Sequence, residues 1–168
     1  MRTKILYAAV AVACALALTA GPADATGGHR STIVMNFAPS GDASASCPGS
    51  LFGIAFDLTS TAGEALGTGR SCVAAIDGCD PFRPRCHQTV TATFTLDLAR
   101  GSVTVPMRLH EILPTEDSFL QRGHGTVAGG TGAYSGATGH LAGGGGGRFT
   151  ERGFEGRLVY ALRLSDVR

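Results

Sequence analysis

The chain has 168 residues, and its 14 lysine and arginine residues nearly balance its 13 aspartate and glutamate residues. After Ala25 every basic residue is an arginine, and these arginines are scattered without a run. This distribution argues against a nucleic-acid-binding surface and a polybasic membrane patch, and the missing lysines exclude Schiff-base chemistry in that part of the chain.

The N-terminal segment has the three parts of a secretory signal peptide. Arg2 and Lys4 give a positive start, residues 5–18 form an uninterrupted apolar run, and Ala23 and Ala25 are the small residues that signal peptidase requires. A membrane anchor is the alternative, but the run is shorter than the roughly 20 residues that span a bilayer. We therefore expect cleavage after Ala25, secretion, and no membrane association after cleavage.

Residues 26–168 have the length of a single domain, in which apolar and polar residues alternate with period two and no stretch shows helical spacing. The clearest stretch sets Val90, Phe94 and Leu96 on one face and a row of threonines on the other. The expected strands contain Ile33 to Phe37, Phe52 to Leu58, residues 70–76, Val90 to Leu98, Val103 to Leu109, Phe119 to Val127, the vicinity of Arg148, and Phe154 to Leu164. About eight short strands in succession favour an antiparallel up-and-down β-barrel, which removes exposed strand edges.

Four cysteines follow the expected cleavage site: Cys47, Cys72, Cys79 and Cys86. In an exported chain an even number predicts two disulfides. A zinc site formed by the last three cysteines and His87 is the alternative, but the cysteines are spaced more widely than structural zinc sites require, so we expect no metal. A hairpin centred near Gly63 would place Cys47 opposite Cys79 and pair the other two. The rival pairing joins Cys47 to Cys72 and Cys79 to Cys86, and both remain open.

Two glycine-rich segments interrupt the alternation. The first, residues 129–139, predicts tight turns with positive φ and close backbone approach. A phosphate-binding loop is the alternative there, but neither a Gly-Lys-Ser/Thr sequence nor an amphipathic helix follows. The second is the unbroken run Gly143 to Gly147, which predicts a mobile hairpin tip.

The first of these segments carries a family resemblance. Its turn motif is Gly-Thr-Gly-Ala-Tyr-Ser-Gly-Ala-Thr-Gly, with Gly130, Gly132, Tyr134, Gly136 and Gly139 at its characteristic positions. It resembles the G-T-G-x-[FY]-x-G-A-x-G signature of the allene oxide cyclase and dirigent superfamily, including its bacterial barrel-like relatives, and the similarity extends over residues 30–166.

The resemblance implies an eight-stranded antiparallel barrel of calycin-like shape with an apolar central cavity. Members of the superfamily cyclise reactive oxylipins or polyketide intermediates, or steer the coupling of phenoxy radicals, mainly by shaping a bound apolar substrate. Their catalytic residues lie outside the shared motif and cannot be matched here one by one. Catalysis therefore does not transfer with the fold.

The alternation also assigns side chains to the barrel interior. The residues expected to line a ligand cavity are Phe52, Ile54, Phe56, Phe94, Met107, Leu109 and Leu158. The interior row that ends at Leu109, extended by two residues, places Glu111 inside and leaves Arg108 and His110 outside. Tyr160 belongs to the interior row of the last strand. An inward carboxylate in apolar surroundings would have the raised pKa that general acid–base chemistry uses. The alternatives are a Glu111 that lies at the wet barrel mouth or pairs with an arginine such as Arg122, and a Tyr160 that only fills the core.

Three functions are compatible with these features. The first is a secreted barrel that binds a small apolar ligand, and the second is a cofactor-free cyclase or dirigent-like enzyme with Glu111 and Tyr160 as its polar groups. The third is an extracellular structural module with a filled core. Export with two disulfides favours a non-catalytic protein over a biosynthetic cyclase. We therefore expect a small-ligand-binding protein that uses no cofactor and no nucleic-acid partner.

Overall fold

The computed structural model describes residues 29–78, 85–151 and 153–168, so the predicted signal peptide and its cleavage site lie outside it. The described chain forms a closed antiparallel β-barrel, which confirms the predicted fold. Its elements are β1 (His29–Ser44), β2 (Phe52–Ser60), β3 (Ala65–Gly78), β4 (Cys86–Leu98), β5 (Gly101–Thr115), β6 (Ser118–Thr126), β7 (Gly129–Gly130), the 3-10 turn η1 (Gly132–Tyr134), β8 (Thr138–Thr150) and β9 (Gly153–Val167).

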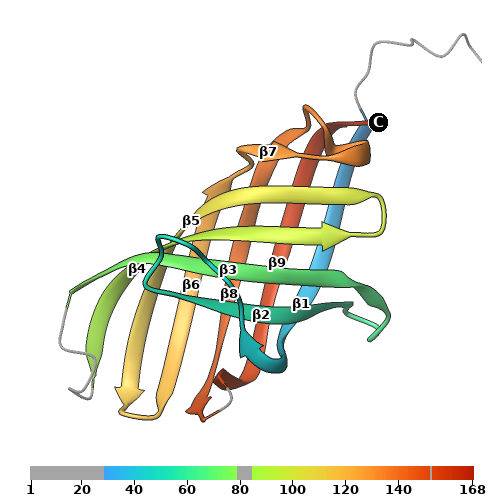
Figure 1. The fold of residues 1–168 in the computed structure, drawn as a ribbon. Helices are drawn as coiled ribbons and strands as arrows, with labels where there is room; N and C mark the ends of the chain where they lie inside the picture. The colour runs from blue at the N-terminus through green and yellow to red at the C-terminus, as the bar shows by residue number, and fades with distance from the viewer. Residues whose placement is uncertain (1–28, 79–84, 152) are drawn as a thin grey trace, which may run out of the picture.

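The sheet closes because its first and last strands pair. Phe37 of β1 lies opposite Leu158 of β9, and Figure 1 shows β1, in blue, running beside β9, in red. β6 and β7 pair with successive parts of β5 and therefore share one position, so the closed ring has eight positions. Closure gives each of these positions two hydrogen-bonded neighbours and removes the exposed edges of an open sheet.

Strand β4 shows how the alternation builds the wall of the barrel. Val90, Phe94 and Leu96 are buried inside, while Thr91 is exposed on the outside. The neighbouring strand β5 follows the same rule, because Leu109 is buried and Arg108 is exposed. The period-two pattern in the sequence therefore predicted correctly which side chains of both strands face the interior.

Aromatic rings fill the middle of the barrel. The ring of Phe37 stacks on that of Phe56, with centroids 4.7 Å apart, and lies 4.9 Å from the ring of Tyr160. The ring of Phe94 completes the group at 5.8 Å from Tyr160. All four side chains are almost fully buried, so this layer of the barrel has a packed core.

Glycines on neighbouring strands make room for two of these rings. Gly69 lies opposite Phe56, and a Cβ atom at Gly69 would lie 2.3 Å from the Phe56 ring. Gly143 lies opposite Tyr160, and a Cβ atom there would lie 2.9 Å from the Tyr160 ring and 2.1 Å from the carbonyl oxygen of Val159. Both contacts are far shorter than packed atoms allow, so the rings occupy space that only glycine leaves free.

The glycine run Gly143 to Gly147 is not a hairpin tip, and that prediction is wrong. It lies inside β8, where each glycine pairs with a residue of β6 on one side and a residue of β9 on the other. Five residues without side chains cannot show an alternation of apolar and polar groups, so the pattern that reveals the other strands is missing here.

The Cys47–Cys72 disulfide decides between the two pairings left open by the sequence, because it excludes the pairing of Cys47 with Cys79. Cys47 lies in the connection that precedes β2 rather than on a straight extension of that strand, and Cys72 of β3 is opposite Gly53. A Cβ atom at Gly53 would lie 2.6 Å from the sulfur of Cys47, so this glycine makes room for the bridge. Cys86 is also disulfide-bonded. Cys79 lies outside the described residues.

The turn motif closes one end of the barrel. Tyr134 and Ala137 are buried in the core, and the backbone nitrogen of Arg168 donates a hydrogen bond to the carbonyl oxygen of Ala133 at 2.9 Å. The glycines with positive φ in this segment are Gly132, Gly136 and Gly139, in agreement with the predicted turns, whereas Gly130 belongs to β7. The turn motif thus closes one end of the barrel with buried side chains.

Replacing Gly143 by alanine should destabilise the barrel, because the new methyl group would collide with the backbone of β9 and the ring of Tyr160. We expect the free energy of unfolding to fall by about 1 to 3 kcal/mol, the usual cost of overpacking. Gly129→Ala is the matched control, since nothing lies within 4 Å of the added atom, and it should leave stability unchanged or slightly raised. Urea denaturation measures both, and equal effects would contradict the assigned packing.

Candidate functional site

A cavity of about 390 Å³ lies inside the barrel. Its polar lining includes Glu111, which is near the end of β5 opposite to the end where Val103 pairs with the turn motif. Of the residues expected to line a ligand cavity, those on its surface are Phe52, Ile54, Phe56, Phe94, Leu109 and Leu158. Met107 is buried in the core and does not line it. The barrel is therefore plugged at one end, packed in its middle and hollow at the other end.

One hydrogen-bonded row of the sheet brings the polar groups of the cavity together. From β4 through β5, β6, β8 and β9 to β1, the paired residues are Gln88, Glu111, Gln121, Gly145, Leu158 and Phe37. The first three are polar and adjacent, and the last two are apolar. Along this row the cavity is therefore polar at β4, β5 and β6 and apolar at β9 and β1.

Gln88 and Glu111 form the centre of the polar side. Nε2 of Gln88 donates a hydrogen bond to Oε2 of Glu111 at 2.8 Å. The Gln88 side chain is only 8% exposed, and its other polar atom, Oε1, is buried and has no hydrogen-bond partner among the described residues. Most buried polar atoms in proteins have a partner, so this unpaired acceptor is an unusual feature of the Gln88 side chain.

Burial raises the pKa of Glu111, and the hydrogen bond from Gln88 opposes that shift. The direction follows from the apolar surroundings, which disfavour the charged carboxylate more than one amide donor stabilises it. Arg122, the pairing partner considered from the sequence, is exposed on the outside of the barrel, and no ion pair joins it to Glu111 in the described part of the chain. His110 is exposed on the outside as well, as the alternation predicts.

Tyr160 belongs to the packed layer beneath the cavity. It is fully buried and does not line the cavity, and its hydroxyl accepts a hydrogen bond from Nε2 of Gln121 at 2.9 Å. Burial is the main cause that raises the pKa of the Tyr160 hydroxyl. The contact spans β8, which lies between the two residues and carries glycines opposite both of them, Gly143 and Gly145. At Gly143 an added Cβ atom would lie 2.9 Å from the Tyr160 ring, so a larger side chain there would displace that ring.

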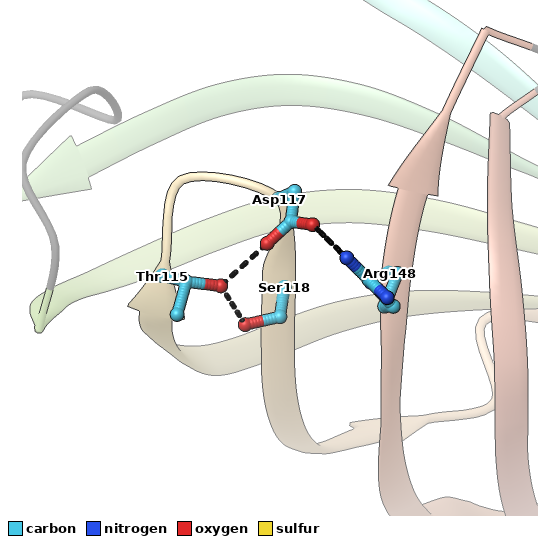
Figure 2. Close-up of polar contacts among 4 residues, drawn as sticks. All are labelled: Thr115, Asp117, Ser118 and Arg148. Atoms are coloured by element: carbon cyan, nitrogen blue, oxygen red, sulfur yellow. Dashed lines mark hydrogen bonds and ion pairs between the residues drawn. The ribbon is translucent and has the colours of Figure 1, made fainter.

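Polar contacts fix one side of the cavity mouth. Figure 2 shows that Asp117, in the turn between β5 and β6, contacts Thr115 and reaches across to Arg148 of β8. The hydrogen bond from Arg148 is the main cause that lowers the pKa of Asp117. Close by, the rings of Phe119 and Phe149 lie 5.0 Å apart, and both line the cavity. These contacts tie the β5–β6 hairpin to β8 beside the opening.

Gln88 and Gln121 also belong to the site, although the sequence did not predict them. Gln88 continues the interior row of Val90 and Phe94 by one step, so the alternation already contained the signal. Gln121 is different, because the glycines around it hide which face of β6 is buried. Only its pairing with Glu111 reveals that it faces inward.

Within the described residues there is no group of three or more side chains that could hold a metal ion. The same residues contain no helix that is long and apolar enough to cross a membrane. No protein-family model matches the chain, and a comparison with curated proteins finds no match either. The interpretation of the site therefore rests on its own geometry and chemistry.

Replacing Glu111 by glutamine should remove a pH dependence of stability. Because the pKa of Glu111 is raised above 4.5, the folded protein retains a proton at pH values where the unfolded chain has released it. The wild-type free energy of unfolding should therefore fall, relative to Glu111→Gln, as the pH rises from 4.5 to the raised pKa. Urea denaturation across this interval measures the difference, and a constant difference would contradict the assigned burial.

Proposed function

We propose that this protein is exported and binds a small apolar ligand in the cavity at the open end of its barrel. The observation that carries the proposal is the cavity itself, whose volume of about 390 Å³ lies within the range of small-molecule sites. Its walls are mainly aliphatic and aromatic side chains, with a few polar groups on one side. This combination is typical of pockets that bind an apolar body and orient it by a small number of hydrogen bonds.

The proposed export is supported by the signal-peptide features before Ala25 and by the cysteines. The Cys47–Cys72 bridge closes a loop with a sequence separation of 25 residues, and Cys86 is bonded as well. Disulfides persist in oxidising compartments, so they fit a protein that works outside the cell. The bridge between Cys47 and Cys72 also holds the chain that precedes β2 against β3, next to the cavity-lining residues Phe52 and Val73.

Similarity to the allene oxide cyclase and dirigent superfamily is part of the proposal. The support for it is the turn motif and the closed eight-stranded barrel, both of which such a protein would have. A barrel of this width holds either packed side chains or one small ligand. Here packed rings occupy the middle and a cavity occupies one end, which favours ligand binding over a purely structural module.

A cavity-filling substitution tests the proposed binding. Ile54 is half-buried in the cavity lining, so Ile54→Trp should fill the space and abolish binding of a naphthalene probe followed by fluorescence. Val34→Trp is the control, because Val34 is 40% exposed on β1 and does not line the cavity. It should bind the probe like the wild type. Failure of the wild type to bind any apolar probe would overturn the proposal.

The second candidate is a cofactor-free cyclase or dirigent-like enzyme. The observation that favours it is the position of Glu111 in the cavity lining, where burial raises the pKa of its carboxyl group and so favours the protonated form that a general acid needs. Tyr160 adds little to this candidate because it is buried below the cavity and bonded to Gln121. A bound apolar ligand that is converted by the wild type, but only bound by Glu111→Gln, would support the enzyme, whereas equal conversion by both would exclude a role for Glu111.

A further inference from the structure

Two arginines and two histidines meet on the outer wall of the barrel, on the face of the sheet opposite to the cavity. Arg108 and His110 lie on β5, and Arg122 and His124 lie on β6. The register of the two strands sets His110 directly opposite Arg122 and Arg108 directly opposite His124. All four side chains are exposed, and we call them the basic block. The two arginines are far from forming a run in the sequence, so only the pairing of β5 with β6 brings them together.

The basic block lacks counter-charges of its own. Opposite charges are the favourable cross-strand pairs, and like charges directly opposite each other destabilise a sheet. Among the described residues, no carboxylate forms an ion pair with any of these four side chains. On β8, the next strand beyond β6, the residues opposite the block are Ala142 and Gly144, which add no charge. A partner that carries negative groups would supply the missing counter-charges.

Two grooves on the outer wall run past the basic block. The first, of about 540 Å³, is lined by His110 and Arg122. The second, of about 500 Å³, is lined by Arg108 and His124. Thr89 lines both grooves and adds a hydroxyl group beside the basic side chains. An anionic chain could therefore follow the wall and meet one arginine and one histidine in each groove.

The lining of the grooves favours an acidic polysaccharide over other polyanions. Ile112 and Leu120 are exposed and directly opposite each other in the first groove, where they offer an apolar surface to the face of a sugar ring. The described lining residues include no phenylalanine or tyrosine, the rings on which proteins commonly stack nucleic-acid bases. The wall of a barrel is also convex, so a flat lipid surface would reach it only along a narrow line.

We propose that the basic block binds an acidic polysaccharide, whose sulfate or carboxylate groups pair with Arg108 and Arg122. This surface lies outside the cavity, so the inference goes beyond the proposed ligand binding, although the proposed export would bring the wall into contact with such polymers. The other titratable residues that line the grooves are Asp77, His87 and Glu111, and Glu111 is bonded to Gln88 inside the barrel. Because histidines gain positive charge as the pH falls from about 8 to 5, binding should strengthen in mildly acidic solution.

Dextran sulfate and uncharged dextran test the inference on the wild-type protein, because they share one sugar chain. Titration calorimetry should show that dextran sulfate binds, that dextran does not, and that the affinity falls as the salt concentration rises. The affinity should also be higher at about pH 5.5 than at about pH 7.5. Failure to bind dextran sulfate would overturn the inference. So would equal or tighter binding of single-stranded DNA or of phosphatidylglycerol vesicles, which would identify a different class of partner.

Three variants locate the binding surface. Arg108→Gln combined with Arg122→Gln should weaken dextran sulfate binding about tenfold, the scale of two exposed ionic contacts. Asp77→Asn removes a negative charge that borders both grooves, so it should strengthen binding. Arg30→Gln combined with Arg70→Gln is the matched control, because it removes the same charge from exposed residues that line neither groove.

The control variant should bind dextran sulfate like the wild type. Equal weakening by the two double variants would show that net charge alone attracts the polymer and would overturn the assignment to the basic block. All three variants should still bind the naphthalene probe in the cavity, which also shows that they are folded. Loss of polymer binding and loss of probe binding are therefore separate results, and each proposal can fail without the other.

Discussion

The packing of four aromatic rings against side-chain-free positions of the wall is the constraint on which the interior of this barrel depends. An eight-stranded barrel has limited internal width, so rings as large as those of Phe37, Phe56, Phe94 and Tyr160 fit only if other inward positions are small. Gly69 and Gly143 meet that requirement directly. The rings then form a layer that divides the interior, with the turn motif on one side and the cavity on the other.

The same glycines connect the packed layer to the polar side of the cavity. The contact between Gln121 and Tyr160 spans β8 at its glycine run, so the amide of Gln121 is held by a residue two strands away. Gln121 is paired in the sheet with Glu111, whose carboxyl group is held by Gln88. The cavity is thus bordered by a chain of oriented amide and carboxyl groups, and oriented groups discriminate between ligands better than mobile ones.

The site combines two properties that favour selective binding over simple hydrophobic capture. Most of its wall is apolar and gives affinity without direction, while the hydrogen-bonded pair of Gln88 and Glu111 is a polar group of fixed orientation. The contacts of Asp117 with Arg148 tie the β5–β6 hairpin to β8, next to the cavity-lining rings of Phe119 and Phe149. In the proposed function, polar groups inside the barrel would select the ligand, and the residues at the mouth would control its entry.

The residue pattern alone was enough to predict most strands, the barrel and the side of the wall on which Glu111 lies. These features depend on a period of two between neighbouring residues, and that period is visible wherever apolar and polar side chains alternate. The sequence did not determine the role of Gly143 to Gly147, because residues without side chains carry no such pattern. It also left the partner of Cys47 open, since the route of the chain before β2 depends on contacts with β3.

Only the tertiary structure decided which polar residues meet in the cavity. Gln88, Glu111 and Gln121 lie on three different strands, and their meeting depends on the register between those strands. The alternation within a single strand defines which face a residue occupies, but it contains no information about which residue of the next strand lies opposite. That register is set by the closure of the whole sheet, so the site could not be assembled from the sequence one strand at a time.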